Sequence, residues 1–289
     1  MPGSGSPTVR RMRLAAELHR LREQAGLTGD QAADELGWSP SKISRIENAR
    51  SGVSVSDTRK LLDLYQVSGT HHGDLVSLAR EASRKGWWET YSELPDDLIE
   101  LIGMEAEATS AWNWEPQVIP GLLQTEGYSR GVVGAWQEWA TVTPAAVDRR
   151  VEARLKRQQR LEGEDPLRLW AVMDESVLSR RFGDNAVMRA QLQHLIEKSR
   201  LDNVSLRVLS LDGKQPVGTG AFLYLRLPRL YQIHLDDIVV LEHHTKSLFV
   251  RREEELIQYE KAFDSLFEAS LPPPRSRDVI ARVMKDTWS

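Results

Sequence analysis

The first part of the chain places apolar residues at the 3.6-residue spacing of amphipathic helices. Leu14, Leu18 and Leu21 begin this pattern, which stops at Gly26, a residue suited to a helix end. The first eight residues, MPGSGSPT, have no periodicity and are expected to belong to a flexible tail. Further periodic stretches predict helices at 28–36, 39–48, 54–65 and 72–85. The pattern therefore predicts five short helices.

Residues typical of helix starts precede the second and third predicted helices. Thr28 and Gln31 have capping-box spacing, in which a hydroxyl and an amide each satisfy a free backbone N–H group. Gly37 is expected to end the second helix. Ser39 suits the N-cap of the third helix, and Pro40 suits its first turn, where a missing N–H does no harm. Two helices joined this tightly are typical of a helix-turn-helix, although other small helical bundles share the pattern.

The third predicted helix has a small, polar and basic outer surface. Ile43 and Ile46 are expected to face inward, and the outward positions are Pro40, Ser41, Lys42, Ser44 and Arg45. Small side chains let a helix approach base edges in the major groove, where Arg or Lys can bond to guanine. We interpret this segment as a DNA recognition helix, and the alternative is a solvated charged helix face.

The stretch LREQAGLTGDQAADELGWSPSKISRIENAR (21–50) resembles the helix-turn-helix of lambda-repressor-like, XRE-type transcription regulators, over about residues 10–69. In that family a glutamine that contacts DNA often follows the cap of the second helix, and here Gly29 occupies that position. The resemblance implies that Arg22 pairs with Glu47 and fixes the angle of the recognition helix. The residues expected at the DNA are Thr28, Gln31, Ser39, Pro40, Ser41, Lys42, Ser44, Arg45 and Arg50.

One helix-turn-helix reads only a half-site, so a homodimer that binds double-stranded DNA is expected. The distribution of charge along the chain supports DNA binding by its N-terminal part. The chain has a net charge of −4, but residues 1–69 carry ten lysines and arginines against eight aspartates and glutamates. A mildly basic first module therefore precedes an acidic remainder, which is disfavoured as a second DNA-binding surface.

Beyond residue 86 the composition changes, because seven of the nine tryptophans lie between residues 87 and 170. Periodicity predicts helices at 96–102, from 125, at 145–161, 187–200 and 253–270, and near the C-terminus. Short apolar runs predict strands at 108–119, 167–173, 204–209, 221–227, 231–235 and 238–241. The last three strands are too close together for helical crossovers and are expected to pair antiparallel.

The expected fold is an all-α helix-turn-helix N-terminal domain followed by a larger α+β domain with an antiparallel or mixed sheet. Its expected parts are a flexible tail (1–9), the helix-turn-helix domain (10–69), a connecting helix (70–86) and an α+β regulatory and dimerisation domain (87–289).

Four stretches of the second domain carry a further resemblance, namely WNWEPQVIPGLLQTEGYSRGVV (112–133), RRVEARLKRQQRL (149–161), VMDESVL (172–178) and LQHLIEKSRLDNVSLRVLSL (192–211). Over about residues 87–270 the chain resembles the C-terminal domain of a large actinobacterial regulator family, whose genes frequently neighbour one for a small partner protein. The resemblance implies a transcription regulator whose second domain dimerises and receives a protein or ligand signal. The alternative is an antitoxin-like protein that neutralises a small partner protein and uses DNA binding for autoregulation.

Candidate partner sites in the second domain leave several possibilities open. Four tryptophans either fill a core or line a pocket for a partner or a small-molecule effector, namely Trp112, Trp114, Trp136 and Trp139. The strands at 221–241 would offer an edge to a strand of a small partner protein, which we favour over a small molecule. The basic run at 149–160 is expected to be a solvated helix face or a second phosphate contact.

Enzymatic chemistry finds little support. The histidine pairs at 71–72 and 243–244 are adjacent rather than four residues apart, so neither forms a metal-binding helix face. Residues 174–176 resemble a strand end and a helix N-cap, and PVGTGAF (216–222) lacks the full dinucleotide fingerprint. We therefore expect no enzyme activity, metal or cofactor.

The composition also indicates a compartment. The chain has no cysteine, no apolar signal segment and no apolar stretch that suits a membrane span. A cytoplasmic, nucleoid-associated protein without a membrane partner is expected.

Overall fold

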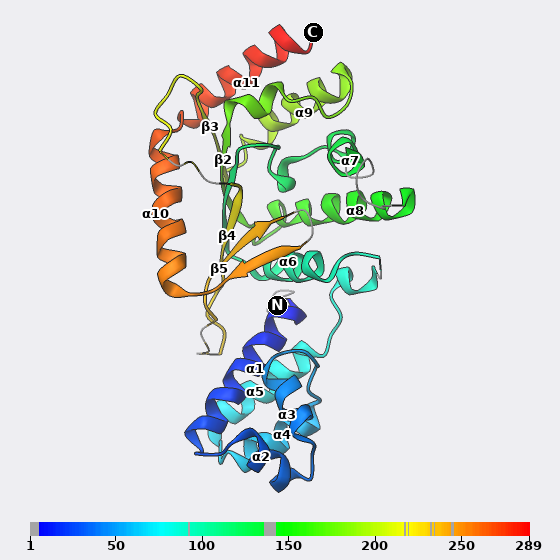
Figure 1. Cartoon of the computed structure of the whole chain (residues 1–289), viewed down its shortest axis with the longest axis vertical. Coiled ribbons are helices and arrows are strands. Elements are labelled where there is room, and N and C mark those ends of the chain that lie inside the picture. Colours follow the sequence, from blue (N-terminus) through cyan, green and yellow to red (C-terminus); the bar gives the residue numbers. More distant parts are fainter. Residues whose placement is uncertain are drawn as a thin grey trace. The chain divides into compact units, whose positions relative to one another are not determined.

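A computed structural model of the chain is drawn in Figure 1. It describes residues 6–91, 93–135, 143–216, 218, 220–231, 233, 235–243 and 246–289. The chain divides into two compact units, the first formed by Met1–Thr90 with Pro228–Leu235 and the second by Tyr91–Leu227 with Asp236–Ser289. We call Pro228–Leu235 the arm, because it belongs to the first unit although it interrupts the sequence of the second.

The first unit contains the five predicted helices, drawn from blue to cyan in Figure 1. Their bounds are α1 Pro7–Gln24, α2 Gly29–Leu36, α3 Pro40–Glu47, α4 Val55–Leu64 and α5 Gly69–Ala82, and a 3-10 turn, η1, follows at Trp87–Thr90. Leu18, Ile43 and Leu62 lie in the shared core of these helices. Leu75 and Leu78 of α5 lie in the same core, so this helix is part of the first unit rather than a separate connector.

The first helix begins earlier than expected. Ser6 is its N-cap, with the hydroxyl accepting a hydrogen bond from the backbone N–H of Val9, and Pro7 stands in the first turn. The indole N–H of Trp88 donates to the hydroxyl of Thr8 over 3.2 Å, which fixes this end of the helix to η1. The expected tail is therefore wrong for residues 6–9, where a Ser-Pro pair starts a helix as it does again at Ser39.

The second unit is built on a six-stranded mixed sheet. Its strands are β1 Ser110–Glu115, β2 Arg168–Asp174, β3 Val204–Leu209, β4 Phe222–Arg226, β5 Ile238–Glu242 and β6 Ser247–Val250. They lie in the order β3-β2-β1-β4-β5-β6, with β1, β2 and β3 parallel and the other neighbours antiparallel. A helical N-terminal region followed by an α+β domain is the fold class expected from the sequence.

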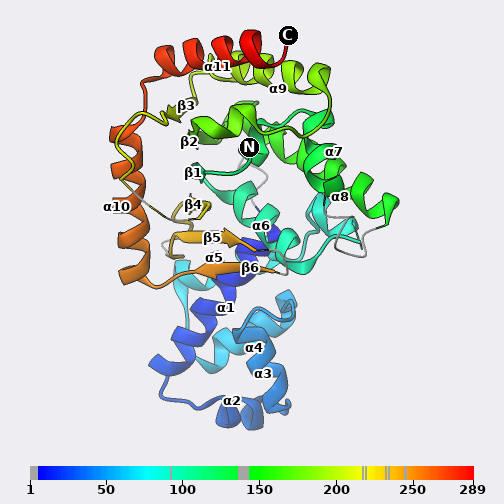
Figure 2. The ribbon, with the colours of Figure 1, turned by 45° about the horizontal axis from the view of Figure 1, so that its top comes forward.

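Helices cover both faces of this sheet (Figure 2). On one face lies α10 (Glu253–Ala269), whose Phe263 and Leu266 pack with Trp114 and Val172. The other face carries α6 Asp96–Glu107, α7 Glu126–Gly134, α8 Pro144–Arg157 and α9 Asn185–Lys198. The short 3-10 turns between these elements in the chain are η2 Gly121–Leu123, η4 Gln158–Leu161 and η5 Glu175–Ser179. The last helix, α11 (Pro273–Thr287), packs on α9 and β3.

The predicted meander at 221–241 is confirmed in part, because β4 and β5 pair antiparallel. Of the strand expected at 231–235 only residues 231, 233 and 235 are described, and among them Ile233 forms an isolated antiparallel bridge with Leu230 in the arm. The strand β6 was not predicted. Since β4 lies between β1 and β5, and β5 between β4 and β6, neither offers the free edge that a partner strand requires.

The edge strand β3 is also occupied at one residue. The backbone N–H of Val208 donates to the hydroxyl of Ser276 over 3.0 Å, and its carbonyl accepts from the N–H of Leu271 over 2.9 Å.

Throughout the described part of the chain, no helix combines the length and apolar character needed to cross a membrane.

Candidate nucleic-acid interface

The helix α3 presents a polar face outside a firm apolar anchor. Ile43 and Ile46 are buried in the core of the first unit, whereas Ser41, Ser44 and Arg45 are exposed. Among the described residues Arg45 has no ionic partner. The exposed face therefore offers two small hydroxyl side chains and an available guanidinium, which suits approach to base edges.

The side chain of Lys42 is engaged within the first unit. Its Nζ atom lies 2.9 Å from Oδ2 of Asp57, at the start of α4, and 3.5 Å from the ring centroid of Trp38. The lysine is therefore held by an ion pair and a cation–π contact. A phosphate that binds Lys42 has to replace or share these partners.

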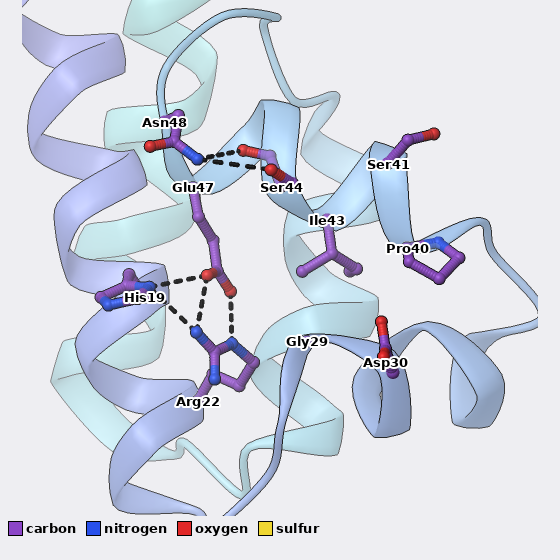
Figure 3. Close-up of a pocket in the computed structure, with 10 residues that line it drawn as sticks. All are labelled: His19, Arg22, Gly29, Asp30, Pro40, Ser41, Ile43, Ser44, Glu47 and Asn48. Atoms are coloured by element: carbon purple, nitrogen blue, oxygen red, sulfur yellow. Dashed lines mark hydrogen bonds and ion pairs between the residues drawn. The ribbon is translucent and has the colours of Figure 1, made fainter.

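An ion pair ties the end of α3 to α1 (Figure 3). Nε and Nη2 of Arg22 donate to the two carboxylate oxygens of Glu47 over 2.7 and 2.8 Å, and Nη1 donates to the carbonyl of Leu27 over 2.7 Å. Nδ1 of His19 lies 2.7 Å from Oε2 of Glu47. The structure thus brings Arg22 and Glu47 together in a bidentate contact, which restricts the orientation of both planar groups.

The ion pair also controls the charge of Glu47. Burial by itself would raise the pKa of this carboxyl, but hydrogen bonds from Arg22 and His19 outweigh burial and lower the pKa below its ordinary value of 4.5. The hydrogen bond to Glu47 in turn raises the pKa of Arg22. Both groups therefore stay ionised at neutral pH, and the negative charge of Glu47 is compensated by the arginine.

The caps around the turn use several of the predicted site residues. The hydroxyl of Thr28 accepts from the N–H of Gln31 over 3.2 Å, and Oε1 of Gln31 accepts from the N–H of Thr28 over 2.8 Å, which completes the expected capping box. The hydroxyl of Ser39 accepts from the N–H of Lys42 over 3.3 Å. Gly37 ends α2 in the left-handed conformation, with φ of 65°. Gly37 and Ser39 together form the turn between α2 and α3, and the capping box fixes the start of α2.

A concavity of about 540 Å³ lies beside the exposed face of α3 (Figure 3). Its lining includes Pro40, Ser41 and Ser44 from α3 and Gly29 from the start of α2. It also includes three residues that were not predicted from the sequence, namely His19, Asp30 and Asn48. The signal available for His19 was its position one helical turn before Arg22. Arg50 is exposed just beyond α3 and does not line the concavity.

The basic run at 149–160 forms the expected solvated face only in part, since Arg149 is exposed whereas three other arginines are engaged within the second unit. Nε and Nη2 of Arg157 donate to the carboxylate of buried Glu105 over 3.0 and 2.8 Å. Nη1 of Arg154 donates to the side-chain oxygen of Gln124 over 2.7 Å, and Arg160 donates to the carbonyl of Ala108 over 2.9 Å. The expectation of a solvated face is wrong for Arg154 and Arg157 of α8 and for Arg160 of η4, because their guanidinium groups donate to neighbouring groups of the second unit.

The four tryptophans proposed for a partner site have different positions. Trp114 is buried in the core beneath α10, whereas Trp112 is half-buried and lines a concavity. Trp136 and Trp139 lie outside the described residues. Within the described ranges, no group of three or more histidine, aspartate and glutamate side chains is placed to hold a metal ion.

The geometry of the first unit, with a capped turn between α2 and an exposed, anchored α3, is that of a helix-turn-helix protein. A protein-family model described as "Helix-turn-helix domain" matches residues 13–75, which supports DNA binding. A second one, described as "Domain of unknown function (DUF5753)", matches residues 98–282, which is more than half of the chain. The chain belongs to this DUF5753 family. Comparisons with curated proteins and with solved structures give no match.

Proposed function

We propose that this protein is a sequence-specific transcription regulator of the XRE type that places α3 in the major groove of double-stranded DNA. The observation that carries the proposal is the exposed face of Ser41, Ser44 and Arg45 on a helix anchored by two buried isoleucines. Small residues permit close approach, and a guanidinium without an ionic partner among the described residues can bond to guanine O6 and N7.

The remaining site residues support this docking in different ways. In the complex, Lys42 breaks its ion pair with Asp57 and contacts a phosphate or a base edge. Arg50, just beyond α3, binds backbone phosphate. The N-terminal ends of α2 and α3, with Thr28, Gln31, Ser39 and Pro40, lie close to the phosphate backbone. The pair of Arg22 and Glu47 has a structural role, because it holds α3 at a fixed angle to α1.

We propose further that the protein acts as a homodimer. A single recognition helix reads only a half-site, and two-fold pairing places two such helices about one DNA turn apart. Light scattering of the full chain, free and bound to DNA, tests this. A monomer in both states at micromolar concentration would contradict it.

The second unit is proposed to receive the signal that changes DNA occupancy. Support comes from the arm, which connects β4 to β5 in sequence but belongs to the first unit. Ile233 lies in the core of that unit, and the hydroxyl of Tyr231 donates to Glu81 of α5 over 3.1 Å. Glu81 also forms an ion pair with Arg10 of α1 over 3.0 Å. The chain itself therefore links the sheet to the helices that support α3.

The main experiment begins by selecting bound fragments from genomic DNA and then measures affinity for the selected sequence at fixed salt. Replacing both Lys42 and Arg45 by alanine is expected to weaken binding by at least about tenfold, because each contact to a base or phosphate contributes about 1 kcal/mol or more. The matched control replaces both Arg200 and Lys214 by alanine, which removes two exposed cations of the second unit outside the basic run at 149–160. Unchanged affinity in a folded double variant would contradict the proposed recognition helix.

The link through the arm has its own test. Tyr231→Phe removes the hydrogen bond to Glu81 while keeping the ring in place. We expect the affinity for the selected DNA to change a fewfold although no residue of α3 is altered, because the hydrogen bond connects the arm to α5. Affinity equal to that of the wild type would show that the arm has only a packing role.

A further inference from the structure

The second unit contains a concavity of about 630 Å³ beside α10, at the starts of β1 and β2. This volume lies in the range of about 300–1,000 Å³ that is typical of small-molecule sites. Aromatic rings from two layers line it, with Trp112 and Trp170 on the sheet and Phe263 and Phe267 on the helix. The helix α10 therefore leaves part of this sheet face open.

The two tryptophans of this concavity differ in what already contacts them. Trp112 is stacked on Phe263, with centroids 5.5 Å apart and planes 12° apart, and the guanidinium of Arg226 lies 4.4 Å from its ring centroid. Trp170 is the register partner of Trp112 on the neighbouring strand and is only partly buried. Among the described residues it has no ring or cation partner. Trp170 thus offers an aromatic surface to a ligand.

Charged groups of both signs surround this ring. Arg168 lies two residues before Trp170 on β2, so both side chains leave the same face of the sheet. Arg168 is exposed, and Asp165 and Asp264 are exposed elsewhere in the lining. Within the described part of the chain none of these three side chains has a hydrogen-bond or ionic partner, whereas Arg226 is bonded to Glu260 over 2.5 Å.

We propose that this concavity binds a small planar aromatic molecule that carries a carboxylate and an amino group. The ring stacks on Trp170, the carboxylate accepts two parallel hydrogen bonds from Arg168, and the amino group donates to Asp165 or Asp264. All residues of this site belong to the second unit, so the proposal does not depend on DNA binding by the first unit.

Three matched probes test the proposal on the full chain without DNA. The first, 6-amino-2-naphthoate, carries both polar groups, 2-naphthoate lacks the amine, and 2-naphthylamine lacks the carboxylate. Fluorescence titration is expected to show the tightest binding for 6-amino-2-naphthoate. Arg168→Met is expected to raise the Kd of both carboxylates about tenfold, through loss of a charge-assisted contact, and to leave 2-naphthylamine unchanged.

Further variants identify the other contacts. Trp170→Leu is expected to weaken all three probes, and the double variant Asp165→Asn with Asp264→Asn is expected to weaken only the two amines. Arg200→Met is the matched control, since it removes an exposed cation of the same unit that does not line the concavity. Circular dichroism and melting temperature establish that each variant is folded.

Several results would overturn the proposal. Binding that is indifferent to Arg168→Met or to Trp170→Leu would place the probes elsewhere. Tightest binding of 2-naphthylamine would mean that the site does not recognise a carboxylate. Absence of binding by all three probes up to about 1 mM, which corresponds to less than about 4 kcal/mol of binding free energy, would exclude a site of this class.

Discussion

The helices α3 and α8 both carry basic residues, yet Arg45 of α3 and Arg157 of α8 have opposite environments. Arg45 of α3 is exposed and has no ionic partner among the described residues. Arg157 of α8 is buried and forms a bidentate ion pair with Glu105. The helix α8 has more cations than α3, and its Arg157 stabilises the interior of the second unit. The number of cations on a helix does not reveal what they bind, because that depends on which side of the helix faces the core.

The difference is visible in the sequence once arginines are counted as possible core residues. On α8, Val147 and Val151 are buried one turn apart, and Arg154 follows three residues later on the same side of the helix. On α3, Ile43 and Ile46 occupy the inward positions and Arg45 falls between them. An arginine that continues an apolar stripe is therefore expected to be buried with a partner, and one that interrupts the stripe is expected to face solvent.

The largest expected effect is on the buried pair of α8. Arg157→Met leaves Glu105, which is 1% exposed, without its charge partner, so we expect the free energy of unfolding to fall by about 3–5 kcal/mol. Urea unfolding followed by tryptophan fluorescence measures this. Replacing both residues by apolar ones should recover most of the loss.

Arg149→Met is the control for this measurement, because Arg149 pairs with Glu152 at a site where both side chains are about half exposed. No measurable change in stability is expected for this variant. If Arg157→Met proves as mild as Arg149→Met, the two sides of α8 do not differ as we describe.

The next largest effect concerns the pair that anchors α3. Glu47→Gln weakens the bonds from Arg22 and His19, and we expect a loss of about 2 kcal/mol in the free energy of unfolding of the first unit. Because the pKa of Glu47 is lowered, its contribution is complete above the ordinary carboxyl pKa of 4.5 and is lost as pH falls through the lowered value.

Thermal melting of wild type and Glu47→Gln at pH 7 and at about pH 3 tests that sign. The difference between the two proteins should shrink at the lower pH. Glu17 also has a lowered pKa, because bonds from Arg20 and His71 outweigh the effect of burial, so the wild type keeps a further acid-sensitive contribution. A difference that stays constant with pH would contradict the assigned role of Glu47.

A smaller effect separates base contact from phosphate contact at Arg45. Arg45→Lys keeps the charge but removes the planar fork that bonds guanine at two atoms. We expect affinity for the selected DNA to fall about tenfold, with affinity for unrelated DNA nearly unchanged. Fluorescence anisotropy on both DNAs at one salt concentration measures this. Equal weakening on both would assign Arg45 to phosphate.

The smallest effect is expected at Lys42. Asp57→Asn releases Lys42 from a partly exposed ion pair, so stability should change by less than about 1 kcal/mol. Affinity for unrelated DNA should rise a fewfold and its salt dependence should steepen. Asp63→Asn, on the same helix, removes an equal charge at an exposed site away from Lys42. Equal behaviour of the two variants would mean that the ion pair does not restrain Lys42.

Local signals made most of the helices predictable. The caps at Thr28 and Ser39 and the glycine at Gly37 lie within a few residues of the turns they form, and the structure has all three. The same Ser-Pro signal at Ser6 lies inside a segment rich in glycine and serine, whose composition predicts a tail instead. The order of the strands depends on pairing between distant segments, so the parallel β1, β2 and β3 and the short β6 left no local pattern to predict them.

The site was predictable in its residues but not in all of its contacts. The outward positions of α3 follow from helical spacing, and Arg45 and Ser44 are exposed as that spacing requires. The partner of Lys42 is Asp57, fifteen residues away on another helix, and no spacing rule connects them. Tyr231 belongs to the first unit but lies far in sequence from the helices of that unit. Its alternation with Ile233 is the local pattern of a strand, and no local pattern links it to α5.

Because of the arm, the unit that contains the helix-turn-helix is not one contiguous stretch of the chain. A fusion that carried only residues 1–90 would keep α3 but lose Ile233 from the core and the backbone carbonyl of Pro228, to which Arg13 donates a hydrogen bond. Buried Arg13 and the apolar surface beneath Ile233 would then meet solvent. A chimera that replaces the helix-turn-helix unit with that of another protein of this fold therefore has to replace the segment between β4 and β5 as well.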